Sequence, residues 1–366
     1  MLKRVTFIMA VLICALLSAG CSIRLDDPVQ TKTVPEGAIG FCAGSVLLLD
    51  DAVPTRSTGL KTTFALADKF FVYGTKTLSN TRYNVFNGQQ VNLQSLGSDA
   101  SDPEDDVWEY SPVRFWDGNA TQYDFLAISG PATNATISSN PAYSGHVSAS
   151  VTYDATGTPY DLMAAGYRRD DGTTSPVNFE FNHVLSAVRV TIINDSPLID
   201  VTVNSYGFRN ICTRATGLIE QRNNGLAPMG TGSWDNLAYN GTVVLGKSDT
   251  LVLDKDETYS LAADQWDLMI PQDLSPHGDY VPQLMLDYEY DQVNPYTDML
   301  EHYHPVFPIR LEEINVKGSN DVIDEWLPGI KYNYEIHIRL GGGINVTVSV
   351  TDWTEVLAET PGLTIL

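Results

Sequence analysis

The chain has 366 residues, which is long enough for two domains with buried cores. It carries 22 Lys and Arg against 45 Asp and Glu, and the resulting formal net charge of -23 disfavours nucleic acid as a partner. A hydrophobic fraction of 43% against a charged fraction of 18% excludes intrinsic disorder for the bulk of the chain, and four cysteines are too few to hold it together as a disulfide framework.

The first residues have the pattern of an export signal. Lys3 and Arg4 precede an apolar run over residues 5–17, which is too short to cross a bilayer as a helix. The small residues directly before Cys21 resemble a bacterial lipobox, in which the cysteine is acylated after cleavage. We therefore expect residues 1–21 to be a lipoprotein signal peptide and Cys21 to carry the lipid. Ordinary signal-peptide cleavage beside an incidental cysteine is the alternative.

The rest of the chain reads as a short tether followed by β-structure. Residues 22–37 are rich in Pro and acidic residues and poor in apolar ones, which is typical of a tether. Beyond them, apolar runs are short, alternating or β-branched and are bounded by turn residues. The clearest candidate for a domain boundary is the polar segment 170–176. We therefore expect an N-terminal domain over residues 38–177 and a C-terminal domain over residues 178–366.

Alternation of apolar and polar residues picks out individual strands. The clearest runs from Ile344 to Val350, and others cover residues 188–192 and 334–340. Helix signals are weak and extend to at most one turn at Asp161–Ala165. Strands separated by turns at short intervals predict an all-β chain built of sandwiches.

Several segments, taken in chain order, point to one family. They are Trp108–Trp116, Tyr123–Ala127, Asp161–Met163, Phe179–Val188, Leu268–Gln272, Trp326–Gly329 with Tyr332 and Tyr334, and Val348–Trp353. Behind a lipobox, this ordered set resembles the Bacteroidales fimbrillins (Mfa-like, type V pilins) over most of the mature chain. Each tryptophan and phenylalanine is also a core anchor, since such side chains bury large apolar areas.

The resemblance implies a structural role with no catalytic residues, cofactor or metal. It implies two tandem transthyretin-like β-sandwich domains, export as an outer-membrane lipoprotein, and trimming by an arginine-specific protease at the cell surface. Trimming removes the first strand, and a strand from another pilin subunit fills the vacated groove. The expected protein is therefore a structural or accessory subunit of a homo- or heteropolymeric fimbrium that supports cell adhesion.

The segment from Ile39 to Leu49 is the expected leaving strand, and a polar loop follows it. Its alternate apolar residues are Ile39, Phe41, Ala43, Leu47 and Leu49. Arg56 and Ser57 flank the expected cleavage site; alternatively, Arg56 is a surface arginine in a loop that is never cut. The expected donor strand is the C-terminal tail, through Leu363, Ile365 and Leu366.

Two further residue types have simple structural interpretations. Cys42 and Cys212 are able to pair in an oxidising compartment, but Cys42 lies in the expected leaving strand, so we expect two buried thiols. His183 lies between apolar residues in an alternating segment, which predicts a packed, hydrogen-bonded histidine and not a catalytic one.

Two other classes of function compete with a pilin. An enzyme or metal site can be drawn around His302 and His304 with Asp298 and Glu301, although the spacing fits no known ligand motif. The other alternative is a monomeric surface lipoprotein that binds a glycan or a host protein through an aromatic platform. The tyrosines of that platform would be Tyr288, Tyr290, Tyr296 and Tyr303.

Overall fold

The structure is a computed structural model, and it describes most of the chain after the expected tether. The described residues are 35–44, 58–59, 64–66, 68–96, 106–129, 135–140, 147–158, 160–223, 225–226, 233–259, 265–339 and 343–352. In this part of the chain the only helical element is one 3-10 turn, η3 (Leu311–Glu313), and everything else regular is β-strand. The predicted all-β class is confirmed.

A six-stranded sheet is the centre of the first group of strands. Its order is β11-β9-β6-β3-β4-β5. The strands are β3 (Lys69–Leu78), β4 (Thr81–Ser95), β5 (Val107–Glu109), β6 (Gln122–Ser129), β9 (Met163–Arg169) and β11 (Asn182–His183). β6 is buried at seven consecutive positions after Gln122, because both faces of the sheet are covered.

One face of this central sheet is covered by a two-stranded parallel pair. The pair is formed by β1 (Phe41–Gly44) and β10 (Val177–Glu180), with Phe41 opposite Val177. Phe70, Phe125 and other side chains of the central sheet join residues of β1 and β10 in one hydrophobic cluster. β1 is therefore part of a core and not an appendage.

The other face is covered by a second sheet, whose order is β15-β14-β8-β7, with β16 also paired to β14. Its strands are β7 (Ala135–Asn140), β8 (Ser148–Asp154), β14 (Arg214–Arg222), β15 (Gly225–Leu226) and β16 (Trp234–Asp235). The two sheets approach closely at Gly166 of β9, where a Cβ atom would collide with the carbonyl oxygen of Gly225. Only glycine fits at that point of β9.

The second group of strands forms a sandwich of two sheets. The larger sheet has the order β2-β19-β12-β26-β27-β24, with β18 paired to β12; the smaller has the order β17-β13-β21-β22, with β23 paired to β21. The larger sheet contains β2 (Thr58–Gly59), β12 (Ser186–Asn194), β18 (Thr258–Tyr259), β19 (Gln265–Met269), β24 (Asn315–Val316), β26 (Ile330–Arg339) and β27 (Gly343–Asp352). The smaller contains β13 (Val201–Ile211), β17 (Gly241–Leu253), β21 (Gln283–Val293), β22 (Leu300–Tyr303) and β23 (Val306–Arg310), and a separate pair joins β20 (Gln272–Asp273) to β25 (Glu325–Trp326).

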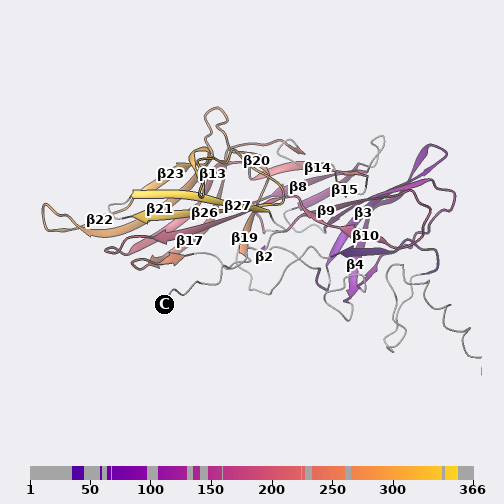
Figure 1. Cartoon of the computed structure of the whole chain (residues 1–366), viewed down its shortest axis with the longest axis horizontal. Helices are drawn as coiled ribbons and strands as arrows, with labels where there is room; N and C mark the ends of the chain where they lie inside the picture. Colours follow the sequence, from indigo (N-terminus) through magenta and orange to yellow (C-terminus); the bar gives the residue numbers. More distant parts are fainter. Residues whose placement is uncertain are drawn as a thin grey trace, which may run out of the picture.

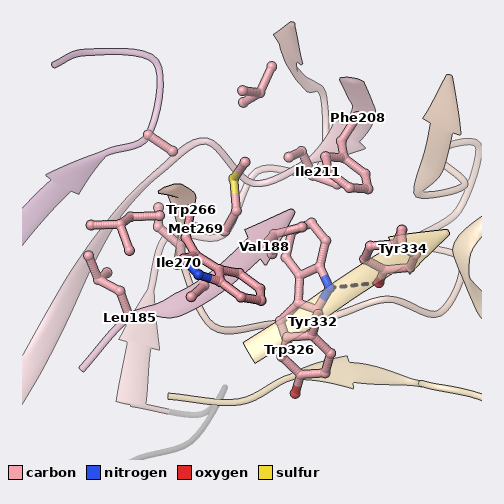
Figure 2. Close-up of a cluster of buried hydrophobic side chains, with 14 of the residues drawn as sticks. Leu185, Val188, Phe208, Ile211, Trp266, Met269, Ile270, Trp326, Tyr332 and Tyr334 are labelled. Carbon is pink, nitrogen blue, oxygen red and sulfur yellow. Dashed lines mark hydrogen bonds between the residues drawn. The ribbon is translucent and has the colours of Figure 1, made fainter. Parts of the chain in front are cut away.

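Aromatic side chains fill the space between these two sheets. Phe208 of β13 makes edge contacts with Trp326 and Tyr334, at ring-centroid distances of 5.2 and 5.5 Å. The indole Nε1 of Trp326 donates a 2.9 Å hydrogen bond to the Tyr334 hydroxyl, so the polar atoms of both rings are paired in the core (Figure 2).

The strands predicted from alternation are present. Residues 344–350 lie in β27, residues 188–192 lie in β12, and β26 extends to Arg339. The predicted helical turn at Asp161–Ala165 is wrong, because β9 begins at Met163. Residues 163–165 are buried on both faces of the strand. The segment therefore lacks the alternation of apolar and polar residues by which a strand is recognised in sequence.

Sheet pairing changes partners after His183. β10 and β11 still pair with strands of the first group, whereas β12 begins the second. The chain later returns, and residues 214–220 of β14 pair with β8 along the whole length of β8. The two groups lie along the long axis, with β3 and β4 at one end and β22 at the other (Figure 1). None of the described residues forms a helix of the length and apolar character needed to cross a membrane.

Candidate functional site

The expected leaving strand contributes an aromatic anchor to the first core. Phe41 of β1 is 4% exposed. Its ring stacks on Phe179 of β10 at a centroid distance of 5.6 Å and an interplanar angle of 18°. It also makes edge or tilted contacts with Phe70, Phe86, Tyr110 and Phe125. Phe41 therefore fills a pocket whose walls are other aromatic rings.

Three apolar residues of the expected leaving strand lie in the same core. Ile39, Phe41 and Ala43 are all buried and belong to one cluster. Leu47 and Leu49, the other two residues expected in the strand, lie outside the described residues. A fully buried Ile or Phe side chain stabilises the fold by about 1.5–3 kcal/mol. Removing β1 would take these side chains away and expose the apolar groove beneath them.

Main-chain hydrogen bonds hold the segment before β1 in a hook formed by residues 110–116. The Ile39 amide donates to the carbonyl of Arg114 at 2.8 Å, and the Trp116 amide donates to the carbonyl of Gly37 at 3.0 Å. The Tyr110 hydroxyl donates to the Ile39 carbonyl at 2.7 Å. Burial raises the pKa of Tyr110, so this phenol remains a donor at neutral pH.

Arg169, which the sequence did not single out, fixes both walls of the groove. It is 4% exposed, and its guanidinium lies 4.5 Å from the ring centroid of Trp116 in the hook. The same guanidinium donates to the carbonyls of Thr173 and Pro176 in the loop that enters β10. In the sequence, Arg169 is visible only as an arginine at the end of an apolar stretch. Its burial depends on contacts with residues of other segments, which the local sequence does not reveal.

The other expected functional residues lie outside the described part of the chain. These are Cys21, Arg56, Ser57, Leu363, Ile365 and Leu366. Described structure resumes at β2, where Thr58 and Gly59 pair in antiparallel fashion with Trp266 and Gln265 of β19. β1 thus belongs to the first group of strands, and β2 to the edge of the second.

The cysteine expectation was half right. Cys212 is a free, buried thiol, and burial raises its pKa. Cys42 is buried but disulfide-bonded, so the expectation of a second thiol is wrong.

His183 is a structural residue, as predicted. Its side chain is 2% exposed, and its Nδ1 lies 2.9 Å from Oδ1 of Asp161. The pair closes the junction at which the chain leaves β11 and enters β12.

The alternative sites around the histidines and tyrosines of the second group do not assemble. His302 and His304 are exposed and contact separate carboxylates, Asp291 at 2.9 Å and Asp287 at 2.7 Å. Among the described residues, no group of three His, Cys, Asp or Glu side chains is placed to hold a metal ion. Tyr288 and Tyr290 are buried and stack side by side, so their faces are unavailable to a glycan.

The family assignment rests on the sequence as a whole. Residues 55–353 match the family model described as fimbrillin-like. The chain belongs to the fimbrillin-like family. No curated protein matches it in sequence. The match includes the central sheet, the hook and both sheets of the second group, while β1 lies just before it.

Several solved structures match most of this chain at low sequence identity. A candidate cell adhesion protein of Bacteroides uniformis ATCC 8492 is 17% identical, with a TM-score of 0.41, and the match covers 88% of this chain and 100% of that one. A candidate cell adhesion protein of Parabacteroides distasonis ATCC 8503 is 10% identical, with a TM-score of 0.46 and coverage of 87% and 97%. A fimbrilin of Porphyromonas gingivalis W83 is 10% identical, with a TM-score of 0.34 and coverage of 86% and 97%. Fimbrillin-like proteins are structural, which agrees with a pilin-like role in adhesion at the cell surface.

Proposed function

We propose that this fimbrillin-like chain is a subunit of a type V pilus that assembles by exchanging β1 for a strand of another subunit. In this proposal the chain is exported as a lipoprotein held in the outer membrane through Cys21, and it folds as two transthyretin-like sandwiches. The observation that carries the proposal is the position of β1, a short strand inside a core with one strand partner, β10.

The groove under β1 has the properties that strand addition requires. Its floor is formed by the rings of Phe70, Phe86, Phe125 and Phe179. One wall, β10, offers a main-chain edge to a parallel strand. Burying four or five apolar side chains and forming new main-chain bonds gives a gross attraction of about 10 to 20 kcal/mol before ordering costs.

A cut between Arg56 and Ser57 suits this geometry. The chain leaves β1 in the first group and next appears at β2 on the edge of the second group. After cleavage, β2 remains attached to the body of the protein, whereas β1 has no main-chain connection to it. An arginine-specific protease therefore converts a covalently tethered strand into one that a donor can displace.

The C-terminal tail is the proposed donor. Leu363 and Ile365 alternate with a polar residue, so both can face the floor of a neighbour's groove, and Leu366 ends the chain given. The partners of this protein are then other pilin subunits, either copies of itself or related chains.

N-terminal sequencing of the protein on intact cells tests the proposal. We expect the surface form to begin at Ser57 and to run as ladders that resist SDS. The Arg56→Ala variant should keep its first strand and remain monomeric. Arg24→Ala is the matched control, because a cut at Arg24 would remove only the tether. A wild-type surface form that begins near residue 22 and stays monomeric would contradict assembly and leave a monomeric binding lipoprotein as the function.

A further inference from the structure

A hairpin at the far end of the second group extends beyond its sheet. The first part of β21 pairs with β13 up to Glu289, but residues 290–293 pair only with β22. A row of stacked rings, Tyr303 on Tyr290 and Tyr290 on Tyr288, anchors this extension to the core. The hairpin lies at the end of the molecule opposite to β3 and β4 (Figure 1).

The tip of this hairpin is an ordered loop. The Asn294 amide donates to the carbonyl of Met299 at 2.8 Å, and the Asp298 amide donates to the carbonyl of Asn294 at 2.9 Å. The Asn294 side chain accepts a hydrogen bond from the Tyr296 amide and donates one to Glu301. Asn294 therefore fixes both ends of the loop.

This ordered tip carries apolar side chains into solvent. Val293 is 51% exposed, Tyr296 95%, Met299 66% and Leu300 67%. Asp298 lies among them, is exposed, and makes no ion pair with any residue that the structure describes. We call these five residues the tip patch. Large apolar side chains gathered on a rigid projection are a feature of protein contact surfaces.

A second exposed patch, on the hook of the first group, has the complementary chemistry. Val113 and Phe115 are 38% and 56% exposed, and the exposed Arg114 lies between them. Within the described residues, the Arg114 guanidinium has no carboxylate partner, whereas its main-chain atoms are held by Tyr110 and Ile39. We call residues 113–115 the hook patch.

We propose that the tip patch of one copy of this chain docks on the hook patch of a second copy. An exposed anion among apolar residues matches an exposed cation among apolar residues. The two patches belong to different strand groups, so the contact is head to tail and leaves a free patch at each end. A head-to-tail contact of this kind builds an open filament when its rotation does not close into a ring.

A second copy offers the tip a cation, Arg114 of the hook patch, which an anionic surface lacks. Asp291, Asp298 and Glu301 lie on the same hairpin as the apolar side chains of the tip. Phosphate-bearing lipids or nucleic acids would be repelled. The contact is small, so we expect it to be weak in solution and to gain strength through repetition along a filament.

The experiment uses the intact, untrimmed protein, in which β1 is still in place, and measures self-association by sedimentation at low and high salt. We expect concentration-dependent association at both salt concentrations, because salt screens the repulsion between two acidic chains as well as the attraction between Asp298 and Arg114. A Tyr296→Ser and Met299→Ser double variant should weaken association at least about tenfold. Leu198→Ser is the matched control, because Leu198 is 65% exposed on another surface, and it should change nothing. Circular dichroism checks that each variant is folded.

Charge reversal identifies the two partners. Asp298→Arg and Arg114→Asp should each abolish association when studied alone, and a mixture of the two variants should associate because every tip then meets a hook of opposite charge. Absence of self-association in the wild type, or a mixture that fails to associate, would overturn the proposed contact. Because β1 stays in place throughout, that result would leave strand exchange untouched, and failure of strand exchange would leave this contact untouched.

Discussion

Phe41 of β1 stacks on Phe179 of β10, with ring centroids 5.6 Å apart. The two residues lie on the parallel pair that covers one face of the central sheet, and both are buried. The stability of the first strand group therefore depends on a segment that, in the proposed function, is later removed.

The Phe41→Ala substitution should lower the stability of the untrimmed protein by about 3–5 kcal/mol, because it empties a pocket lined by aromatic rings. The free energy of unfolding is measured by urea titration, with hydrogen exchange of the β10 amides as the probe. Phe115→Ala is the control, since Phe115 is 56% exposed, and it should cost less than about 1 kcal/mol. Equal effects of the two substitutions would mean that β1 does not support the core.

The Tyr334→Phe substitution should destabilise the second strand group by about 1–3 kcal/mol. It leaves the indole Nε1 of Trp326, which is fully buried, without its acceptor. Thermal unfolding monitored by tryptophan fluorescence reports the change. Tyr280→Phe, at a tyrosine that is 46% exposed, should have an effect close to zero. An unchanged midpoint for Tyr334→Phe would argue against the hydrogen bond.

The Asp124→Asn substitution should be more costly, at about 3–5 kcal/mol. The Asp124 carboxylate is 1% exposed and accepts hydrogen bonds from Arg82 at 2.8 Å and Arg168 at 2.7 Å, so its loss leaves two partly buried cations uncompensated. Denaturant titration measures it. The matched control is Asp117→Asn, which removes a partly exposed ion pair with Lys76 and should cost no more than about 1 kcal/mol. A milder effect at Asp124 than at Asp117 would contradict this ranking.

The order of the tip hairpin should depend on pH. Hydrogen bonds from the Tyr303 hydroxyl and the Asn294 amide lower the pKa of Glu301. The folded hairpin therefore binds a proton less readily than the unfolded one. Its stabilisation by Glu301 is present above the ordinary glutamate pKa and is lost as pH falls through the lowered folded-state value.

Amide hydrogen exchange of residues 294–301 across the acid range measures this dependence. In the Glu301→Gln variant, the protection of these amides should depend less on pH than it does in the wild type. His302, which contacts Asp291 across the two strands of the hairpin, is unchanged in both proteins, so their difference isolates Glu301. Identical profiles would show that Glu301 does not hold the loop.

The sequence predicted those parts of the fold that have one buried face. Residues 344–350 alternate because only one side of β27 packs on the core, and that strand was found correctly. β9 was missed because the central sheet is covered on both sides, which removes alternation from residues 163–165. The return of β14 to pair with β8 joins residues far apart in the chain, and local periodicity carries no information about such pairing.

The candidate site was predicted in the same partial way. The family resemblance placed Ile39, Phe41 and Ala43 in one strand, and these residues share a core, although Cys42 between them is buried as well. Their strand partner and the guanidinium of Arg169 that fixes both walls were not predictable, because each contact depends on where distant segments meet. The exposed tip was also hidden, since the buried Tyr288 and the exposed Tyr296 look alike in sequence.

The pairing of Phe41 with Val177 has a consequence for export. A parallel strand needs a long connection, and in the proposed export nearly half of the chain would leave the translocation channel before β1 meets its partner. On that proposed route an apolar, aggregation-prone ribbon would be exposed in the periplasm until then. We expect a holding chaperone to bind the emerging polypeptide at this stage, and slow folding of the segment up to β10 to prolong its dependence on that chaperone.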